Sequence, residues 1–508
     1  MGADGGRERK RLCDNFSMEH MERFSGGRVP RWEMGVSRSR ILLLIAAIVA
    51  PAIWTESLLV RYEIGVPFAD DYVAILGFAL KYRAQSSAAA KWLMIFTDQY
   101  QEYKPTFAHL LLALDMSLFG RVHKEFLDLL GNAFLVPIGW MLWRSCFPRA
   151  WPLQLRLTLF VPVSLLLFTP VYWEAMDWAA AGLLYTPALT FGIAALYLLV
   201  PGAGKPGKRP GLAAMAGASV AAILLCLTSP GGFLLYPVGL WFGVLGGQAK
   251  PWKASLRRAW AQGVCWTGAF AVGYVPYVFH YQRYDSGTKR SALHSVVFAM
   301  GVAGSMLPRV NLALAAAVAM VGVAALAVRL RFDRVNPRMC SLAIWMGATC
   351  LLVGAVRDFP ALIASIESRY SIHSLLLAIC CYSFAVHVVR QWTSDAARLQ
   401  LVYAAAVLFT LGFFVTEMSA VRLLLATRRT MMVKVCLNNL RQPGGSGPDA
   451  ETWAEQRSAL AGALKAGIYT LPDEVRRDEA DEGFITVRVP FFLGKNGDKP
   501  RGFGIHPQ

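Results

Sequence analysis

Residues 41–60 read ILLLIAAIVAPAIWTESLLV, and residues 66–72 read VPFADDY. The first stretch is long enough to cross a bilayer, because a spanning helix needs about 18 apolar residues. The second stretch places two adjacent carboxylates, Asp70 and Asp71, in the first hydrophilic segment after that span. Carboxylates beside a membrane are costly to keep, so they indicate function, although Asp is also a favoured helix N-cap and an apolar-rich run follows.

Apolar runs of similar length recur along the chain. Of the 508 residues, 55% are hydrophobic, which predicts an all-α polytopic membrane protein with about eleven transmembrane helices. Two apolar segments, residues 106–119 and 292–307, are too short to cross and are predicted as interfacial or re-entrant helices. The predicted spans are residues 41–60, 126–143, 157–173, 179–200, 211–228, 232–247, 259–279, 310–330, 339–356, 370–389 and 401–415.

The basic residues follow a topological pattern. The net charge is +18, but Lys and Arg stand at the ends of apolar runs, which argues against nucleic acid as a partner. Five loops assigned to the inside hold 16 Lys or Arg, and four short loops assigned to the outside hold 5. The positive-inside rule therefore predicts a cytoplasmic N-terminus and a C-terminus on the outer face, which is the periplasmic face if the protein lies in a bacterial inner membrane. The inside loops are residues 144–156, 201–210, 248–258, 328–338 and 390–398.

This layout divides the chain into three parts. Residues 1–40 form a basic cytoplasmic tail, residues 41–417 the transmembrane domain, and residues 418–508 an outer-face C-terminal region with a small domain. Within the transmembrane domain, residues 61–125 form an outer loop that carries the acidic pair. Most of the nine Cys fall within spans, and none shows metal-ligand spacing.

The topology gathers acidic, basic and aromatic residues on the outer face. A carboxylate there can deprotonate an acceptor hydroxyl while cations hold a phosphate leaving group. Asp70 and Asp71 are the predicted catalytic residues, with Asp71 preferred as the base. Arg369 is predicted to hold phosphate in a bidentate way, although a role as a snorkelling anchor at the membrane interface explains this residue about equally well. The other substrate-binding candidates are Glu102, Lys104, His109, Glu174 and Tyr370.

The order of these features resembles the GT-C membrane glycosyltransferases, the superfamily of protein O-mannosyltransferases and oligosaccharyltransferase catalytic subunits. It is most similar to bacterial members in which an Asp-Asp pair after the first span is followed by a Glu-His-Arg-like motif. The resemblance covers about residues 40–415, and the His-Arg positions of that motif are replaced here. The matching segments are Asp70-Asp71, Glu102-Tyr103-Lys104, Phe168-Thr169-Pro170 through Trp173-Glu174, Ser229-Pro230-Gly231-Gly232 and Ser368-Arg369-Tyr370.

The resemblance implies a specific reaction. The donor would be a sugar on a polyprenyl phosphate, and the acceptor a glycan, lipid or protein of the cell envelope. The transfer would invert the anomeric carbon, with an Asp of the first outer loop as base, and would serve polysaccharide or glycoconjugate biosynthesis. Some members need a divalent metal, and oxygen ligands from Asp71, Glu174 and Asp177 would suit Mg²⁺ or Mn²⁺.

Three other functions compete with this interpretation. A lipid or glycan transporter would be expected to show internal repeats and charges within spans, and few of either are present. An O-antigen polymerase or ligase also uses lipid-linked sugars but relies on outer Arg residues, for which Arg357 and Arg369 are available. A non-catalytic membrane scaffold would leave the envelope glycans unchanged when deleted.

Overall fold

The computed structural model describes residues 37–101, 103–203, 210–245, 252–282, 291–357, 361–392, 396–441 and 450–480. Every named element in these residues is helical, and the extended pairing among them is a single bridge between Tyr100 and Tyr103. The all-α class predicted from the sequence is therefore confirmed for the described part of the chain.

Eight helices are long and apolar enough to cross a membrane by length and composition. They establish a polytopic, membrane-embedded protein. They are Arg38–Tyr62, Lys124–Ser145, Leu153–Tyr172, Ala179–Leu199, Val310–Arg329, Pro337–Val356, Ser368–Arg390 and Arg398–Leu440.

The other three predicted spans, residues 211–228, 232–247 and 259–279, do not meet that standard. The first two form helices of 17 residues or fewer, and the third lies in a long helix whose apolar stretch is diluted by Gly, Trp, Tyr and Gln. The structure thus supports eight of the eleven predicted spans by this standard.

The elements run in the following order. They are α2 (Arg38–Tyr62), η1 (Asp71–Gly77), α3 (Phe78–Ala84), α4 (Ala88–Thr97), α5 (Thr106–Phe119), α6 (Lys124–Ala133), α7 (Leu135–Ser145), α8 (Leu153–Leu167), η2 (Pro170–Ala175), α9 (Ala179–Leu199), α10 (Leu212–Thr228), η3 (Pro230–Leu234), α11 (Leu235–Gly239), η4 (Leu240–Val244), α12 (Trp252–Val278), α13 (Ala292–Ala303), α14 (Val310–Arg329), α15 (Phe332–Val335), α16 (Pro337–Val356), η5 (Leu362–Ile366), η6 (Ser368–Tyr370), α17 (Ser371–Trp392), α18 (Ala396–Arg441), α19 (Ala450–Lys465) and α20 (Asp473–Ala480).

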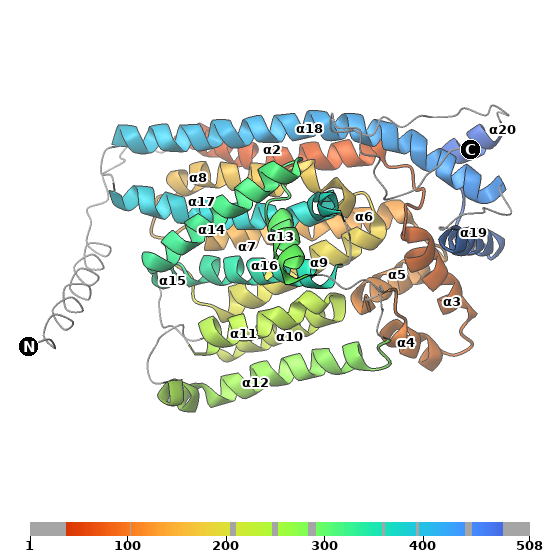
Figure 1. The fold of residues 1–508 in the computed structure, drawn as a ribbon, viewed down its shortest axis with the longest axis horizontal. Coiled ribbons are helices and arrows are strands. Elements are labelled where there is room, and N and C mark those ends of the chain that lie inside the picture. Colours follow the sequence, from red (N-terminus) through yellow and green to blue (C-terminus); the bar gives the residue numbers. More distant parts are fainter. Residues whose placement is uncertain are drawn as a thin grey trace, which may run out of the picture.

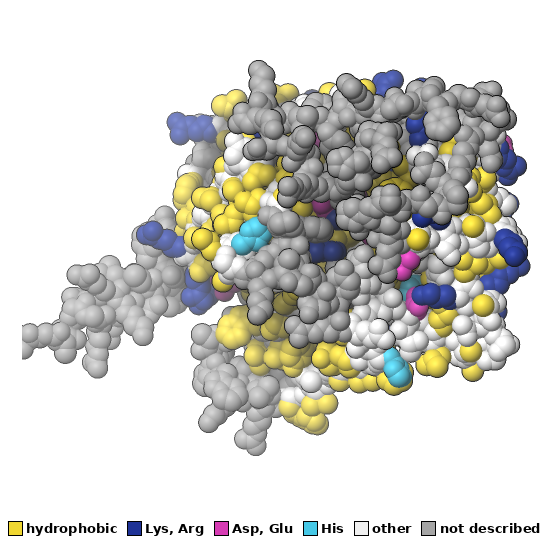
Figure 2. Space-filling view, turned by 45° about the vertical axis from the view of Figure 1, so that its right-hand side comes forward, with side chains coloured by type: hydrophobic (Ala, Val, Ile, Leu, Met, Phe, Trp, Pro, Cys, Tyr) yellow, Lys and Arg dark blue, Asp and Glu magenta, His cyan; other side chains and the backbone are white. Residues whose placement is uncertain are grey.

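The long helices lie side by side, and several of the short ones gather at one end of the bundle (Figure 1). The cluster of α3, α4, α5, α19 and α20 occupies the end where α2 finishes, whereas α15 lies at the opposite end and α11 and α13 lie between the two ends. In Figure 2, apolar side chains are abundant where grey atoms do not cover the surface, and Lys and Arg lie both at the margins and near the centre. Exposed apolar side chains in such number are typical of a surface that contacts a membrane.

One predicted boundary differs in the structure. The helix α18 is 46 residues long and runs through the predicted boundary between residues 417 and 418, because no Gly or Pro interrupts residues 413–441.

The short apolar segment predicted at residues 292–307 contains the helix α13. This helix lies against α14, α16 and α17 and crosses them steeply in Figure 1. Its interfacial or re-entrant position stays a prediction.

The outer loop and the C-terminal region share one apolar core at the end of the bundle. Leu76 and Leu112 from the loop pack in the same cluster as Leu460 and Val475. The backbone N–H of Val122 also donates to the carbonyl of Ile468, at 2.8 Å. The two regions therefore form one cap at this end of the bundle, although Val122 and Ile468 lie 346 residues apart in sequence.

Helices α6 and α9 approach so closely that their contact requires glycine. A Cβ atom on Gly131 would lie 3.2 Å from the backbone of Gly182, and one on Gly182 would lie 3.1 Å from the carbonyl oxygen of Ala175. The hydroxyl of Thr186 on α9 donates to the Gly131 carbonyl at 2.6 Å. Small residues at a helix crossing are how backbones come together in a membrane.

We predict that Gly131→Val destabilises the protein by about 1–3 kcal/mol, because the added side chain meets backbone that cannot move aside. The measurement is the thermal stability of the detergent-solubilised protein. Gly322→Val on α14 is the matched control, since nothing lies within 4 Å of the Cβ position there. Equal stability of the two variants would show that the contact between α6 and α9 tolerates a larger side chain.

Candidate active site

A buried ionic network joins four distant parts of the chain. The ammonium of Lys124 lies 2.6 Å from a carboxylate oxygen of Asp128 and 3.1 Å from one of Glu63. The guanidinium of Arg428 pairs with the carboxylate of Asp177 and also donates to its backbone carbonyl at 3.2 Å. These side chains are at most 9% exposed, so each charge depends on its partners.

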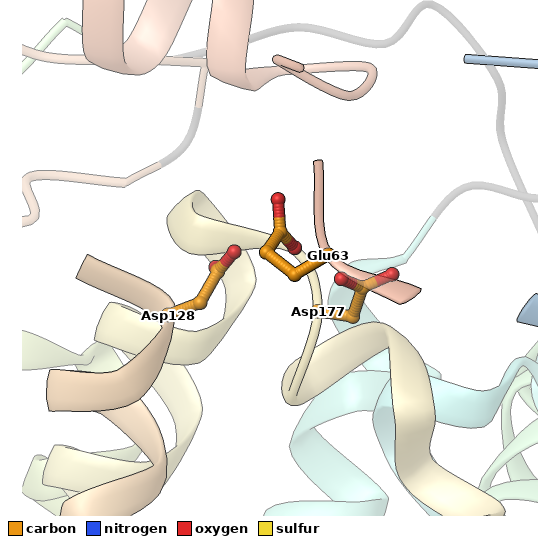
Figure 3. A group of neighbouring side chains, drawn as sticks. All are labelled: Glu63, Asp128 and Asp177. Carbon is orange, nitrogen blue, oxygen red and sulfur yellow. The ribbon is translucent and has the colours of Figure 1, made fainter. Parts of the chain in front are cut away.

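Three carboxylates of this network, those of Glu63, Asp128 and Asp177, converge from separate segments (Figure 3). One oxygen from each lies within 4.8 Å of the others, and convergent oxygens of this kind are the ligands that Mg²⁺ prefers. Lys124 and Arg428 already contact all three groups, so two cations of the protein itself offset most of the charge of the three carboxylates. The group is therefore best explained as an ionic anchor.

The metal ligands predicted from the sequence do not lie together in the structure. Among the described residues, the structure places Asp177 with Glu63 and Asp128, and it does not gather Asp177 with Asp71 and Glu174. Burial raises the pKa of Asp177, and the charge of Arg428 opposes that rise. A metal requirement stays a prediction without a ligand set.

Asp71 acts as a helix cap, but for a distant helix. Its two carboxylate oxygens accept hydrogen bonds from the backbone N–H of Phe68, at 3.0 Å, and of Ala180, at 2.8 Å. Ala180 lies in the first turn of α9, where unpaired N–H groups favour a carboxylate. Burial raises the pKa of Asp71 to about 6, against the lowering effect of Lys124 and of both donors. Asp71 lines a void of about 10 Å³, which has room for about one water molecule.

Asp70 is less buried than Asp71 and faces a different set of groups. The hydroxyl of Tyr100 donates to one of its carboxylate oxygens at 2.7 Å. Tyr100 pairs through its backbone with Tyr103, with two N–H to carbonyl distances of 2.9 Å. Since Tyr103 lines the cavity described next, this short turn connects Asp70 to the cavity wall.

A cavity of about 370 Å³ lies between the outer halves of six helices and helical turns. Its wall is mostly apolar and aromatic, and it carries a cation, Arg357, whose guanidinium donates to the hydroxyl of Tyr103. Such a cavity suits a ligand that has an apolar part and an anionic group. Lining residues include Tyr103, Tyr185, Phe233, Tyr274, Tyr277, Trp345 and Arg357.

Glu174 and Arg369 meet next to this cavity. A carboxylate oxygen of Glu174 accepts the backbone N–H of Arg369 at 3.1 Å, and the Glu174 N–H donates to the hydroxyl of Ser368 at 3.0 Å. The Arg369 guanidinium pairs with Glu367 and lies over the ring of Trp178, at 5.3 Å. Two positions that the sequence analysis assigned to substrate binding are therefore in direct contact.

The other predicted substrate-binding residues lie elsewhere. His109 is buried and stacks on Phe78 with ring centroids 3.9 Å apart, and burial lowers its pKa to about 4, so it is a neutral packing residue. The ammonium of Lys104 donates to the carbonyls of Pro276 and Phe279 at the end of α12. Tyr370 is buried edge-on against Tyr185, which lines the cavity. Glu102 lies outside the described residues.

Sequence analysis missed the ionic network and the contact between the C-terminal region and the loop that carries Asp70. The hydroxyl of Tyr469 donates to the carbonyl of Gly65 at 2.9 Å, so the C-terminal region holds the segment before Asp70. One signal was available: Lys124 and Asp128 are spaced i,i+4 at the start of an apolar run, and charges in such a place rarely lack a role. Glu63, which pairs with Lys124 from 61 residues away, and the Arg428–Asp177 pair, whose members lie 251 residues apart, had no local signature.

We predict that Arg428→Met lowers the stability of the protein by about 3–5 kcal/mol, because it leaves the buried Asp177 without its cation. The neighbouring Arg429→Met is the control. Arg429 pairs with Glu474 at a half-exposed site, where an ion pair contributes at most about 1 kcal/mol. Thermal stability in detergent is the measurement, and Asp177→Asn should restore part of the loss in the Arg428→Met background. Equal losses in the two single variants would contradict the anchoring role.

Comparison with protein families, with characterised proteins and with solved structures finds no match to this chain. The geometry of the described residues is therefore the basis for a functional assignment. That geometry combines an apolar cavity, a cation at its wall and a carboxylate connected to it.

Proposed function

We propose that this protein is a membrane glycosyltransferase of the GT-C type. It transfers a sugar from a polyprenyl-phosphate donor to a cell-envelope acceptor on the outer face of the membrane. The observation that carries the proposal is the cavity of about 370 Å³ with Arg357 at its wall and Asp70 connected to it through Tyr100. The motif order shared with GT-C enzymes supports the same function.

The wall of the cavity suits a lipid-linked phosphate. Apolar and aromatic side chains accept the first units of an isoprenoid chain, and a guanidinium binds phosphate through paired hydrogen bonds. Arg357 is better placed for this role than Arg369, because Arg357 lines the cavity and Arg369 is not among its lining residues. The hydrogen bond between Arg369 and Glu174 then stabilises the segments at the edge of the proposed site.

Asp70 is the better candidate for the base. Asp71 has both oxygens bonded to backbone N–H groups and lines a void too small for a sugar. Asp70 keeps a side-chain donor, Tyr100, that aligns one carboxylate oxygen without burying the group. The structure therefore favours the reverse of the preference drawn from the sequence.

The proposed step transfers one proton and one glycosyl group. Asp70 accepts the proton of the acceptor hydroxyl as that oxygen attacks the anomeric carbon of the donor. The bond between the anomeric carbon and the phosphate oxygen breaks, and its electron pair leaves with the lipid phosphate. Arg357 stabilises the charge that develops on this leaving group.

An O-antigen ligase type of mechanism is the second candidate. Such an enzyme relies on outer Arg residues, and Arg357 at the cavity wall favours it. The two candidates differ in the role of Asp70, because only the GT-C type needs its carboxylate as a base.

We predict that Asp70→Asn lowers sugar transfer about 10²–10⁴-fold at normal expression, the usual effect of losing a general base. The assay compares envelope glycans of a deletion strain complemented with wild-type or variant protein. Asp71→Asn is the matched control, because it removes the adjacent carboxylate. We expect it to reduce stability, since its amide N–H₂ would face a backbone donor, and to retain transfer in proportion to the folded protein.

Two results would contradict the proposal. Full transfer by Asp70→Asn would exclude the carboxylate as the base and favour the ligase type. Unchanged glycans in the deletion strain would exclude both enzymes and favour a scaffold.

We also infer eleven crossings with the acidic pair outside. The helices α2 and α18 run in the same direction in Figure 1, so an odd number of crossings separates the start of α2 from the end of α18. Eight crossings would return the chain to its starting side. Counting α10, the η3–α11–η4 segment and α12 gives eleven, and the basic loops then all lie on the side opposite Asp70.

This topology predicts that a reporter fused after Gly247 is cytoplasmic and one fused after Gln508 is periplasmic. An alkaline phosphatase and a green fluorescent protein fusion at each site make the measurement, because each is active on one side only. A cytoplasmic signal from the fusion after Gln508 would contradict the proposed orientation and, because the loop with Asp70 packs on the C-terminal region, would place the proposed site on the inside.

A further inference from the structure

Four arginines gather at the end of the bundle opposite the acidic pair. Arg144 ends α7, Arg149 lies in the connection to α8, Arg156 lies on α8, and Arg338 lies in the first turn of α16. Printed contacts bring these segments together: the amide of Asn336, two residues before Arg338, donates to the carbonyl of Ser145, and Arg156 lies over the ring of Trp143, next to Arg144. Like charges held in one place repel one another, so such a cluster favours an anion.

The amide of Asn336 joins two of the elements that carry this cluster. It donates to the carbonyl of Ser145 at 2.9 Å, which ties the start of α16 to the end of α7. The guanidinium of Arg338 donates to the carbonyl of Val200 at 2.7 Å, so it is held in place by backbone. The cluster is thus a fixed feature of this end of the bundle.

Three of the four guanidiniums lie over aromatic rings. Arg156 lies 4.4 Å from the ring of Trp143, Arg338 lies 4.3 Å from that of Tyr197, and Arg144 lies 5.9 Å from that of Trp140. A ring on one face leaves the edge of a guanidinium, with its N–H donors, for a ligand.

No carboxylate neutralises the four cations within the part of the chain that the structure describes. None of the four forms an ion pair there, and the Nε atoms of Arg144 and Arg156 are buried without a hydrogen-bond partner. By contrast, Lys124 and Arg428 at the other end of the bundle are both paired with carboxylates. The arginine cluster therefore differs from that network in having no carboxylate partner among the described residues.

We propose that the arginine cluster binds the phosphate of an anionic phospholipid headgroup. The cluster stands where apolar helices end, and the adjoining Trp140 is 53% exposed and Leu153 is 50% exposed, which places lipid chains beside it. Basic pockets between transmembrane helices recognise anionic headgroups in this way, and each Arg near the surface strengthens the attraction. The site is separate from the proposed active site at the opposite end.

Native mass spectrometry of the full-length protein tests the site by counting lipids retained from mixtures of phosphatidylglycerol and phosphatidylcholine. We expect the wild type to prefer phosphatidylglycerol. In the double variant Arg156→Gln/Arg338→Gln, the ratio of retained phosphatidylglycerol to phosphatidylcholine should fall about fivefold for each guanidinium removed. Arg149→Gln gives a second measurement at an exposed position, where loss of folding is not a concern.

The matched control is the double variant Arg329→Gln/Arg334→Gln, which removes two exposed charges near the same end of the bundle. It should keep most of the preference. Equal retention of both lipids by the wild type, or an equal loss in the control, would overturn the proposal. Displacement of the lipid by millimolar inorganic phosphate would show that the site takes free phosphate, and would overturn its assignment to a headgroup.

Discussion

The buried contact of Lys124 with Glu63 and Asp128 holds the outer end of the bundle together. Removing charges from water is expensive, so such a group persists only when every member has a partner. Here the partners come from the end of α2, the start of α6, the turn before α9 and the middle of α18. Any shift of these four segments would separate the charges, and the network therefore fixes their relative positions.

The acidic loop depends on that network. Arg428 pairs with Asp177 and also lies 4.0 Å from the ring of Phe68, two residues before Asp70. Ala69 has a φ of 45°, a conformation that a side chain disfavours, so neighbouring contacts must hold it there. Tyr469 and Gln456 supply them by donating to carbonyls in the loop. The C-terminal region is thus part of the scaffold around the proposed base.

Much of the fold followed from the sequence, because apolar length alone identifies helices that cross a membrane. The sequence indicated either a base or a helix cap for this acidic pair, but it did not show which carboxylate caps a helix, because Asp71 bonds to Ala180, which lies 109 residues later. Likewise, Glu174 and Arg369 were both predicted at the outer face, but the contact between them joins positions 195 residues apart. Hydrophobic periodicity identifies residues that share one face of a helix, and it gives no information about contacts between distant segments.

The long helix α18 connects the helices of the bundle, which enclose the cavity, to the cap at the end of the bundle. Residues 398–440 include the last of the eight apolar helices, and the helix continues without a break to Arg441. A continuous helix transmits position rigidly, so its contacts with α2 and α8 also set where Arg428 meets Asp177. Because the cap packs on this helix and on the loop before Asp70, the proposed base is positioned by the bundle itself.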